Sequence, residues 1–135
     1  MFVVDASIAL AWCFDDETTE ATDIVLRRLL LEGAIAPAHW PLEVANGLRY
    51  GEKRGRLNRS KLSIAQSLLG DLLVDLVPVD VGTALRAGEV ARRHDLSVYD
   101  AAYLDLAASR GLGLATLDSR LSTACRKARV PLVAA

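Results

Sequence analysis

Short apolar segments alternate with longer helical segments along this chain, and this alternation restricts its fold more than any other feature. The segments expected to be strands are Met1–Asp5, Ala34–Ala38, Leu76–Val79, Leu114–Leu117 and Pro131–Val133. The segments expected to be helices are Ser7–Phe14, Glu17–Leu31, Pro41–Lys53, Lys61–Asp75, Gly82–His94, Val98–Arg110 and Ser119–Lys127. The short segments do not alternate with polar residues, which is typical of parallel strands covered on both faces. The pattern predicts an α/β fold, a three-layer α/β/α sandwich with a central parallel sheet of four or five strands.

The length and composition fit one such domain. A chain of 135 residues, 52% of them hydrophobic, can form one core and one domain over residues 1–135. No apolar run approaches the ~18 residues that would span a membrane, and residues 1–14 lack the basic start of a signal peptide. We therefore expect a cytoplasmic protein that has no membrane partner.

Metal chemistry based on sulfur or imidazole is not expected here. Cys13 and Cys125 have no metal-ligand spacing and cannot supply a disulfide framework. His39 and His94 are the only histidines, which argues against a zinc site built from His and Cys.

The net charge of −1 hides an acidic beginning and a basic middle. Residues 1–26 contain six acids and no Lys or Arg. Residues 49–61 contain only one acid, Glu52, and six basic side chains. The basic ones are Arg49, Lys53, Arg54, Arg56, Arg59 and Lys61. The distribution of charge, rather than its sum, therefore marks two segments of opposite sign.

Four carboxylates lie among apolar neighbours, where an uncompensated charge is costly. They are Asp5, Glu43, Asp100 and Asp118. Each has a local structural explanation. Asp5 and Asp118 follow strands and can cap helices, Glu43 lies in a first helical turn, and Asp100 completes a capping box with Ser97.

Taken together, the four acids suggest more than capping. All of them are expected at the carboxyl edge of the sheet, where open α/β sheets bind ligands. Four acids in one crevice repel one another or take up protons unless a cation lies between them. Carboxylate oxygens without His or Cys favour Mg²⁺ or Mn²⁺, and the matching chemistry is in-line attack of a metal-activated water on a phosphodiester.

Three polar residues are placed to support these carboxylates. Asn46 stands one helical turn beyond Glu43, where it can orient that carboxylate or a metal-bound water. Ser7 and Thr116 each lie two residues from an acid, and their hydroxyls can hold the carboxylates in place. The alternatives are a buried amide bonded to backbone for Asn46 and ordinary cap or strand roles for Ser7 and Thr116.

The segments around the four acids resemble a known family. They are Val3-Val4-Asp5-Ala6-Ser7, Leu42-Glu43-Val44-Ala45-Asn46, Tyr99-Asp100-Ala101-Ala102-Tyr103-Leu104 and Ala115-Thr116-Leu117-Asp118-Ser119-Arg120-Leu121. In order and spacing they resemble the PIN-domain family, and most closely its small VapC-type ribonuclease toxins of toxin–antitoxin pairs.

The resemblance implies a Mg²⁺- or Mn²⁺-dependent endoribonuclease that acts as the toxin of a type II toxin–antitoxin system. It implies that Asp5, Glu43, Asp100 and Asp118 form the acidic pocket. The position of Asp118 varies more among members of the family than the other three. It also implies a homodimer and a cognate antitoxin, whose tail places a basic side chain in the pocket.

The basic segment gains a candidate role from this resemblance, because cations outside an acidic pocket would hold RNA phosphates. The residues expected to do so are Arg49, Lys53, Arg54 and Arg56. The alternative is a solvated surface. A weaker basic group consists of Arg120, Arg126, Lys127 and Arg129. The apolar sides of Glu17–Leu31 and Lys61–Asp75 are expected to offer a dimer or antitoxin groove, or simply to pack in the core.

Three other functions remain open from the residues alone. One is a domain of the same fold that binds RNA or an antitoxin without cleaving. Another is a receiver-type signalling module, which would need a Lys after a late strand. The late strand Leu114–Leu117 is followed by Asp118 and no Lys, which argues against this function. A phosphatase with an Asp nucleophile would need a second acid two residues after Asp5, where Ser7 stands.

Overall fold

The computed structural model describes residues 1–134 and contains a parallel sheet of four strands over that range. The strands are β1 (Phe2–Val4), β2 (Ala34–Pro37), β3 (Val74–Val77) and β4 (Leu114–Ala115), in the spatial order β3-β2-β1-β4. Their register pairs Val3 of β1 with Ile35 on one side and with Leu114 on the other. The predicted α/β fold with a central parallel sheet is therefore confirmed.

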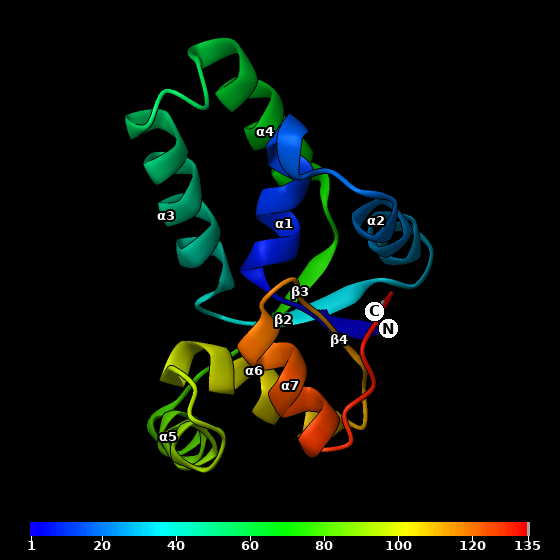
Figure 1. Ribbon diagram of the computed structural model, residues 1–135, viewed down its shortest axis with the longest axis vertical. Coiled ribbons are helices and arrows are strands. Elements are labelled where there is room, and N and C mark those ends of the chain that lie inside the picture. Colours follow the sequence, from blue (N-terminus) through cyan, green and yellow to red (C-terminus); the bar gives the residue numbers. More distant parts are fainter. Residues whose placement is uncertain (135) are drawn as a thin grey trace.

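Helices cover both faces of the sheet (Figure 1). They are α1 (Ala6–Cys13), the 3₁₀ helix η1 (Asp15–Glu17), α2 (Glu20–Glu32), α3 (Trp40–Lys53), α4 (Arg59–Asp71), α5 (Val81–His94), α6 (Val98–Arg110) and α7 (Ser119–Lys127). Figure 1 shows α1, α3 and α4 above the sheet and α5, α6 and α7 below it. No helix within residues 1–134 is long and apolar enough to cross a membrane.

The order of the strands explains this arrangement and creates a crevice. The chain moves outward from β1 through β2 to β3 and then returns past β1 to β4. Because parallel crossovers are right-handed, this reversal places the helices before and after β3 on opposite faces.

Ligands bind in open α/β sheets at such a switch point, beyond the carboxyl ends of the strands. Asp5 directly follows β1 and Asp118 lies shortly after β4, so both lie at this crevice.

A close contact between α1 and α3 fixes one wall of the crevice. A Cβ atom on Gly47 would come within 2.4 Å of Leu10 Cδ1, and one on Gly51 within 2.6 Å of Phe14 Cζ. Glycine at both positions lets the side chains of Leu10 and Phe14 pack directly on the backbone of α3. The first turn of α3, which contains Glu43, is thereby held near the end of β1.

The predicted start of the second helix is wrong. The helix predicted over Glu17–Leu31 begins at Glu20, because Asp15–Glu17 forms a separate 3₁₀ turn. Thr19 caps α2 in a reciprocal capping box with Thr22. The cap at Thr19 starts the helix three residues later than predicted, and the apolar stripe expected from the sequence lies wholly within α2.

The boundary between α4 and β3 also differs from the prediction. The helix predicted over Lys61–Asp75 begins at Arg59 and ends at Asp71. β3 begins at Val74 rather than Leu76, because its backbone pairs in parallel with β2. The helical spacing of the leucines in this region cannot reveal such a long-range pairing.

The last strands are shorter than predicted. β4 ends at Ala115 instead of Leu117, because the next side chain turns toward the end of β1. The segment predicted as a strand over Pro131–Val133 contributes only an isolated parallel bridge between Leu114 and Leu132. The sheet therefore has four strands within residues 1–134, the lower of the two numbers expected.

Candidate active site

The carboxyl ends of β1 and β4 lie at a pocket of about 280 Å³. Its lining residues are Asp5, Ala6, Ser7, Leu10, Glu43, Asn46, Gly47, Asp100, Tyr103 and Asp118. The four acids that we expected to lie together thus share one pocket, which we call the carboxylate pocket. Two of the three predicted supporting residues, Ser7 and Asn46, line it as well.

Asp5 is the most enclosed of the four carboxylates, with 4% of its surface exposed. It caps α1, because its Oδ1 accepts a hydrogen bond from the Ile8 N–H at 3.2 Å. Ser7 Oγ donates to the same oxygen at 2.6 Å, and Thr116 Oγ1 donates to Oδ2. A carboxylate has about four lone-pair sites. These bonds therefore orient Asp5 firmly and leave capacity for about one further ligand.

Ser7 and Thr116 also connect the ends of the two neighbouring strands. Ser7 Oγ accepts a hydrogen bond from the Leu117 N–H at 2.9 Å. Thr116 Oγ1 accepts one from the Asp118 N–H at 3.0 Å. Each hydroxyl thus links Asp5 to the loop between β4 and α7. The sequence predicted support from both residues, but it did not predict that both would serve Asp5.

The pKa of Asp5 indicates an uncompensated charge. Burial raises this pKa to about 6, although the hydrogen bonds from Ser7, Thr116 and Ile8 favour the ionised form. The negative charge of Asp100 contributes to the rise. Since three hydrogen bonds do not offset the burial, a positive charge in the pocket would stabilise ionised Asp5.

Asp100 lines the pocket from the first turn of α6. Ser97 Oγ accepts a hydrogen bond from the Asp100 N–H at 3.1 Å and caps α6. The reciprocal bond from the Ser97 N–H to Asp100 does not occur within residues 1–134, so the predicted capping box is only half formed. The pKa of Asp100 is raised by burial and then by the charges of Asp118 and Glu43.

Glu43 is held by two donors that the sequence analysis missed. Tyr103 Oη donates a hydrogen bond to Glu43 Oε1 at 2.7 Å, and His39 Nε2 lies 3.1 Å from the same oxygen. Partial burial raises the pKa of Glu43, but these contacts from His39 and Tyr103 outweigh it, so the pKa lies below its ordinary value. The pocket therefore keeps Glu43 ionised while the pKa values of Asp5 and Asp100 are raised.

The orientation of His39 follows from its neighbours. Its Nε2 also lies 3.2 Å from the carbonyl oxygen of Tyr99. Because this oxygen and the Glu43 carboxylate both accept hydrogen bonds, Nε2 carries the proton. The ring packs against Tyr99 and Tyr103, with centroid distances of 5.7 and 5.0 Å. The only sequence signal for the contact between His39 and Glu43 is their four-residue spacing at the start of a helix.

Asn46 and Asp118 have more open positions. Asn46 is exposed and lines the pocket, so the alternative of a buried amide bonded to backbone is wrong. Asp118 Oδ1 accepts a hydrogen bond from the Leu121 N–H at 2.9 Å, which confirms it as the cap of α7. For Asp5 and Asp118, the capping role and a place in the pocket are therefore compatible.

The donor atoms of the pocket suit a hard divalent cation such as Mg²⁺ or Mn²⁺. Within residues 1–134, no three His, Cys, Asp or Glu side chains lie close enough together to form a metal cage. This geometry fits an ion that keeps several waters and is held by one or two carboxylates and a substrate phosphate. The raised pKa values of Asp5 and Asp100 fit such an ion, because a cation would relieve both.

The basic residues predicted to bind RNA lie at the far end of α3 and in the loop after it. Arg49, Lys53 and Arg54 are exposed on this part of the chain. The guanidinium of Arg54 lies 4.6 Å from the centroid of the Tyr50 ring. We call Arg49, Lys53 and Arg54 the α3 basic patch. Their predicted contact with RNA stays a prediction.

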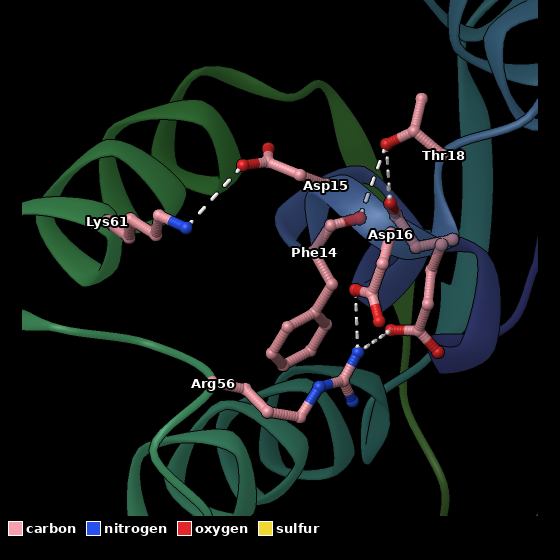
Figure 2. Close-up of polar contacts among 8 residues, drawn as sticks. Phe14, Asp15, Asp16, Thr18, Arg56 and Lys61 are labelled. Carbon is pink, nitrogen blue, oxygen red and sulfur yellow. Dashed lines mark hydrogen bonds and ion pairs between the residues drawn. The ribbon is translucent and has the colours of Figure 1, made fainter.

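Arg56 differs from the α3 basic patch because the acidic beginning of the chain holds it (Figure 2). Its Nη2 lies 2.9 Å from Asp16 Oδ1 and 3.2 Å from Glu17 Oε2. Its guanidinium also lies 4.1 Å from the centroid of the Phe14 ring. We call these four residues the η1 cluster. Its ion pairs neutralise most of the charge that Arg56 was expected to offer to RNA.

Comparison with known proteins identifies the family. The family model described as PIN domain matches residues 2–127. Ribonuclease VapC9 of Mycobacterium tuberculosis is 37% identical over 123 residues, which are 90% of this chain and 89% of that protein. Ribonuclease VapC3 of the same organism is 33% identical over 122 residues, which are 90% of this chain and 85% of that protein.

Two crystal structures share the fold. PAE2754 from Pyrobaculum aerophilum aligns with a TM-score of 0.66 at 22% identity, over 91% of this chain and 83% of its own. FitAcB from Neisseria gonorrhoeae aligns with a TM-score of 0.64 at 22% identity, over 98% of this chain and 96% of its own. The family match and the VapC relatives each extend over almost the whole chain. This chain therefore belongs to the PIN-domain family, as a relative of the VapC ribonucleases.

Proposed function

We propose that this chain is an endoribonuclease of the VapC type, which hydrolyses RNA phosphodiester bonds in the carboxylate pocket with Mg²⁺ or Mn²⁺. The observation that carries the proposal is the meeting of Asp5, Glu43, Asp100 and Asp118 in one pocket. In the hydrolysis, a bond forms between phosphorus and the oxygen of water. The phosphorus–oxygen bond to one ribose breaks, and the leaving oxygen takes a proton.

Each carboxylate has a proposed part in this site. Asp5, Asp100 and Asp118 line the pocket, where a cation held by one or two of them would relieve the repulsion of Asp100 with Asp5 and with Asp118. Glu43 is kept ionised by Tyr103 and His39. A bound Mg²⁺ or Mn²⁺ would supply a water of lowered pKa and would neutralise charge on the phosphate. Ser7 and Thr116 hold Asp5 in a fixed orientation, and Asn46 is free to orient a water at the rim.

The α3 basic patch would hold RNA phosphates before or after the scissile bond. Arg49 lies six residues and Arg54 eleven residues beyond Glu43, which is about 9 to 16 Å along a helix. Cations at that distance attract the RNA backbone without neutralising the carboxylates themselves.

We also propose that the protein is the toxin of a type II toxin–antitoxin system, and that an antitoxin covers it. An apolar pocket of about 440 Å³ between α3, α4 and β3 supports a protein partner of this kind. Among its lining residues is Trp40, whose Nε1 is buried and has no hydrogen-bond partner within residues 1–134. An amphipathic partner helix could fill this groove with its apolar side.

A homodimer belongs to the same proposal. The start of α5 carries two large apolar side chains in solvent, Val81 at 75% and Leu85 at 67% exposure. A second copy that covered them would remove this apolar surface from water. Sedimentation analysis of the purified chain would show whether it associates.

The experiment that tests the proposed activity uses purified protein and 5′-end-labelled RNA. We expect cleavage with Mg²⁺ or Mn²⁺, no cleavage with a chelator, and recovery when metal is added back. The Asp100→Asn variant, purified in the same way, controls for a contaminating nuclease. A wild-type protein that binds RNA in a gel shift but leaves it intact with both metals would favour the alternative of a non-catalytic binding domain.

A further inference from the structure

A second polar cavity lies between the end of α5 and the exposed side of α7. It has a volume of about 340 Å³, and its polar lining residues are His94, Asp95, Ser119, Arg120, Thr123 and Lys127. We call it the α7 groove. It shares no residue with the carboxylate pocket or with the α3 basic patch.

The α7 groove is positively charged and its cations are free. Arg120 and Lys127 are exposed, and neither lies within 4.0 Å of a carboxylate in residues 1–134. Residues 119–134 contain no Asp or Glu, and Asp95 is the only acid in the lining. Arg56, by contrast, is paired with two acids. The α7 groove therefore has unused capacity for an anion.

The groove begins where the carboxylate pocket ends. Asp118, which lines that pocket, is also the cap of α7. Arg120, Thr123 and Lys127 follow at spacings of three and four residues and thus lie along one side of the helix. At 1.5 Å per residue, Lys127 lies about 13 Å from Asp118 along the axis. A nucleic acid strand that left the pocket along α7 would meet these two cations in turn.

The two basic regions lie on opposite sides of the pocket. Figure 1 shows α3 rising from the edge of the sheet and α7 descending from it, so their far ends point in opposite directions. The basic residues of each helix lie beyond the turn that supplies the pocket with its acid, Glu43 for α3 and Asp118 for α7. A strand whose scissile phosphate lies in the pocket can therefore have cations on both sides of the cut.

We infer that the α7 groove binds phosphates of the RNA segment that lies across the cut from the α3 basic patch. Arg120 and Lys127 are the contacting residues, and they act as positioning residues for the strand. This inference rests on the proposed ribonuclease function and adds a second region of RNA contact to it. It predicts that substrates long enough to reach the groove use it and that very short ones do not.

The test compares two double variants that lose the same charge. Arg120→Gln with Lys127→Gln removes the cations of the groove, and Arg27→Gln with Arg110→Gln removes two other exposed cations. Binding of a fluorescent 12-nucleotide single-stranded RNA is measured by anisotropy in EDTA at several salt concentrations. Two lost phosphate contacts should reduce the slope of log affinity against log salt by about 1.4. The control should keep the wild-type slope, and melting curves should show both variants folded.

Cleavage of a trinucleotide and of the 12-nucleotide RNA adds a readout that misfolding would not imitate. We expect the groove variant to slow cleavage of the long RNA only. If wild type cleaves RNA and the groove variant matches the control in slope and in rate, the proposed function stands and the inference is overturned. If wild type neither binds nor cleaves RNA, both are overturned. If the groove variant loses binding of poly-glutamate but keeps the RNA slope, the groove serves an acidic protein, which also overturns the inference.

Discussion

Carboxylates occur in two contrasting regions of this protein, the carboxylate pocket and the η1 cluster. In the pocket, Asp5 and Asp100 are enclosed among other acids, and the pKa of each is raised. In the η1 cluster, Asp16 and Glu17 lie in solvent and contact the guanidinium of Arg56 (Figure 2). The same type of side chain thus has opposite surroundings at the two ends of α1.

The difference shows which region is built for a ligand. In the η1 cluster the guanidinium of Arg56 already pairs with both acids, and as exposed ion pairs these contacts contribute little to stability. The carboxylate pocket concentrates negative charge at a cost to the fold, and hydrogen bonds from Ser7 and Thr116 hold Asp5 in place despite that cost. Unfavourable, well-oriented charge of this kind is a mark of functional sites.

The largest expected effect is on catalysis. Asp5→Asn or Asp100→Asn should reduce the rate of RNA cleavage on the order of 10³-fold, because several kcal/mol of metal-dependent stabilisation are lost. Asp16→Asn, which makes the same chemical change in the η1 cluster, should leave the rate unchanged. Initial rates with end-labelled RNA measure both. If Asp16→Asn reduced the cleavage rate as much as Asp5→Asn or Asp100→Asn, the distinction between the two regions would be wrong.

The next effect is on the pH dependence of stability without metal. The pKa of Asp5 is about 6 in the folded protein, against the ordinary aspartate value of 3.8 that applies to the unfolded chain. The folded state therefore binds more protons between these values, and stability falls as pH rises from about 4 to about 6. The ionisation of Asp5 lowers the free energy of unfolding by at most about 3 kcal/mol over this range.

Urea unfolding in EDTA at several pH values isolates this effect. The Asp5→Asn variant should lack this fall, so the difference between wild type and variant gives the contribution of Asp5. Glu43 contributes in the opposite sense, since its lowered pKa favours folding above the unfolded value, but it is present in both proteins. Asp16→Asn should behave like wild type. If the stability of Asp5→Asn depended on pH as strongly as that of wild type, the raised pKa of Asp5 would be contradicted.

Metal should stabilise the protein through the pocket alone. At a Mn²⁺ concentration 100 times the dissociation constant, the free energy of unfolding increases by about 2.7 kcal/mol. Melting curves with and without Mn²⁺ should show this gain in wild type and in Asp16→Asn, but not in Asp100→Asn. If Asp16→Asn lost the gain and Asp100→Asn kept it, the ion would bind at the acidic start of the chain instead.

The smallest effect is expected in the η1 cluster. Arg56→Gln should lower the melting temperature slightly at low salt, because it removes two exposed ion pairs and the contact with Phe14. Most of the difference should disappear in 1 M salt, where the Debye length is about 3 Å. RNA affinity should change less than in Arg49→Gln. A larger loss of RNA affinity in Arg56→Gln would return this residue to the RNA surface, as the sequence first suggested.

Much of this site could be predicted because it depends on local order along the chain. A strand, an acid and a helix in succession place Asp5 and Asp118 at the same edge of a parallel sheet. Their roles as caps follow from the same local pattern. The family resemblance rests on these positions too, and the match over residues 2–127 bears it out.

What could not be predicted depends on contacts between distant segments. Tyr103 reaches Glu43 across sixty residues, and Thr116 reaches Asp5 across more than one hundred. The ion pairs of Arg56 join the acidic start to the basic middle, which the sequence presents as separate segments. No local spacing signals any of these contacts, since each arises from the packing of the finished fold.

Direct titration of Mn²⁺, followed by electron paramagnetic resonance, tests the central claim that the carboxylate pocket is a divalent metal site. Wild type and Asp16→Asn should bind Mn²⁺ with the same affinity, and the Asp5→Asn/Asp100→Asn double variant should leave the ion free in solution. Equal binding by all three proteins, or loss of binding in Asp16→Asn alone, would contradict the claim.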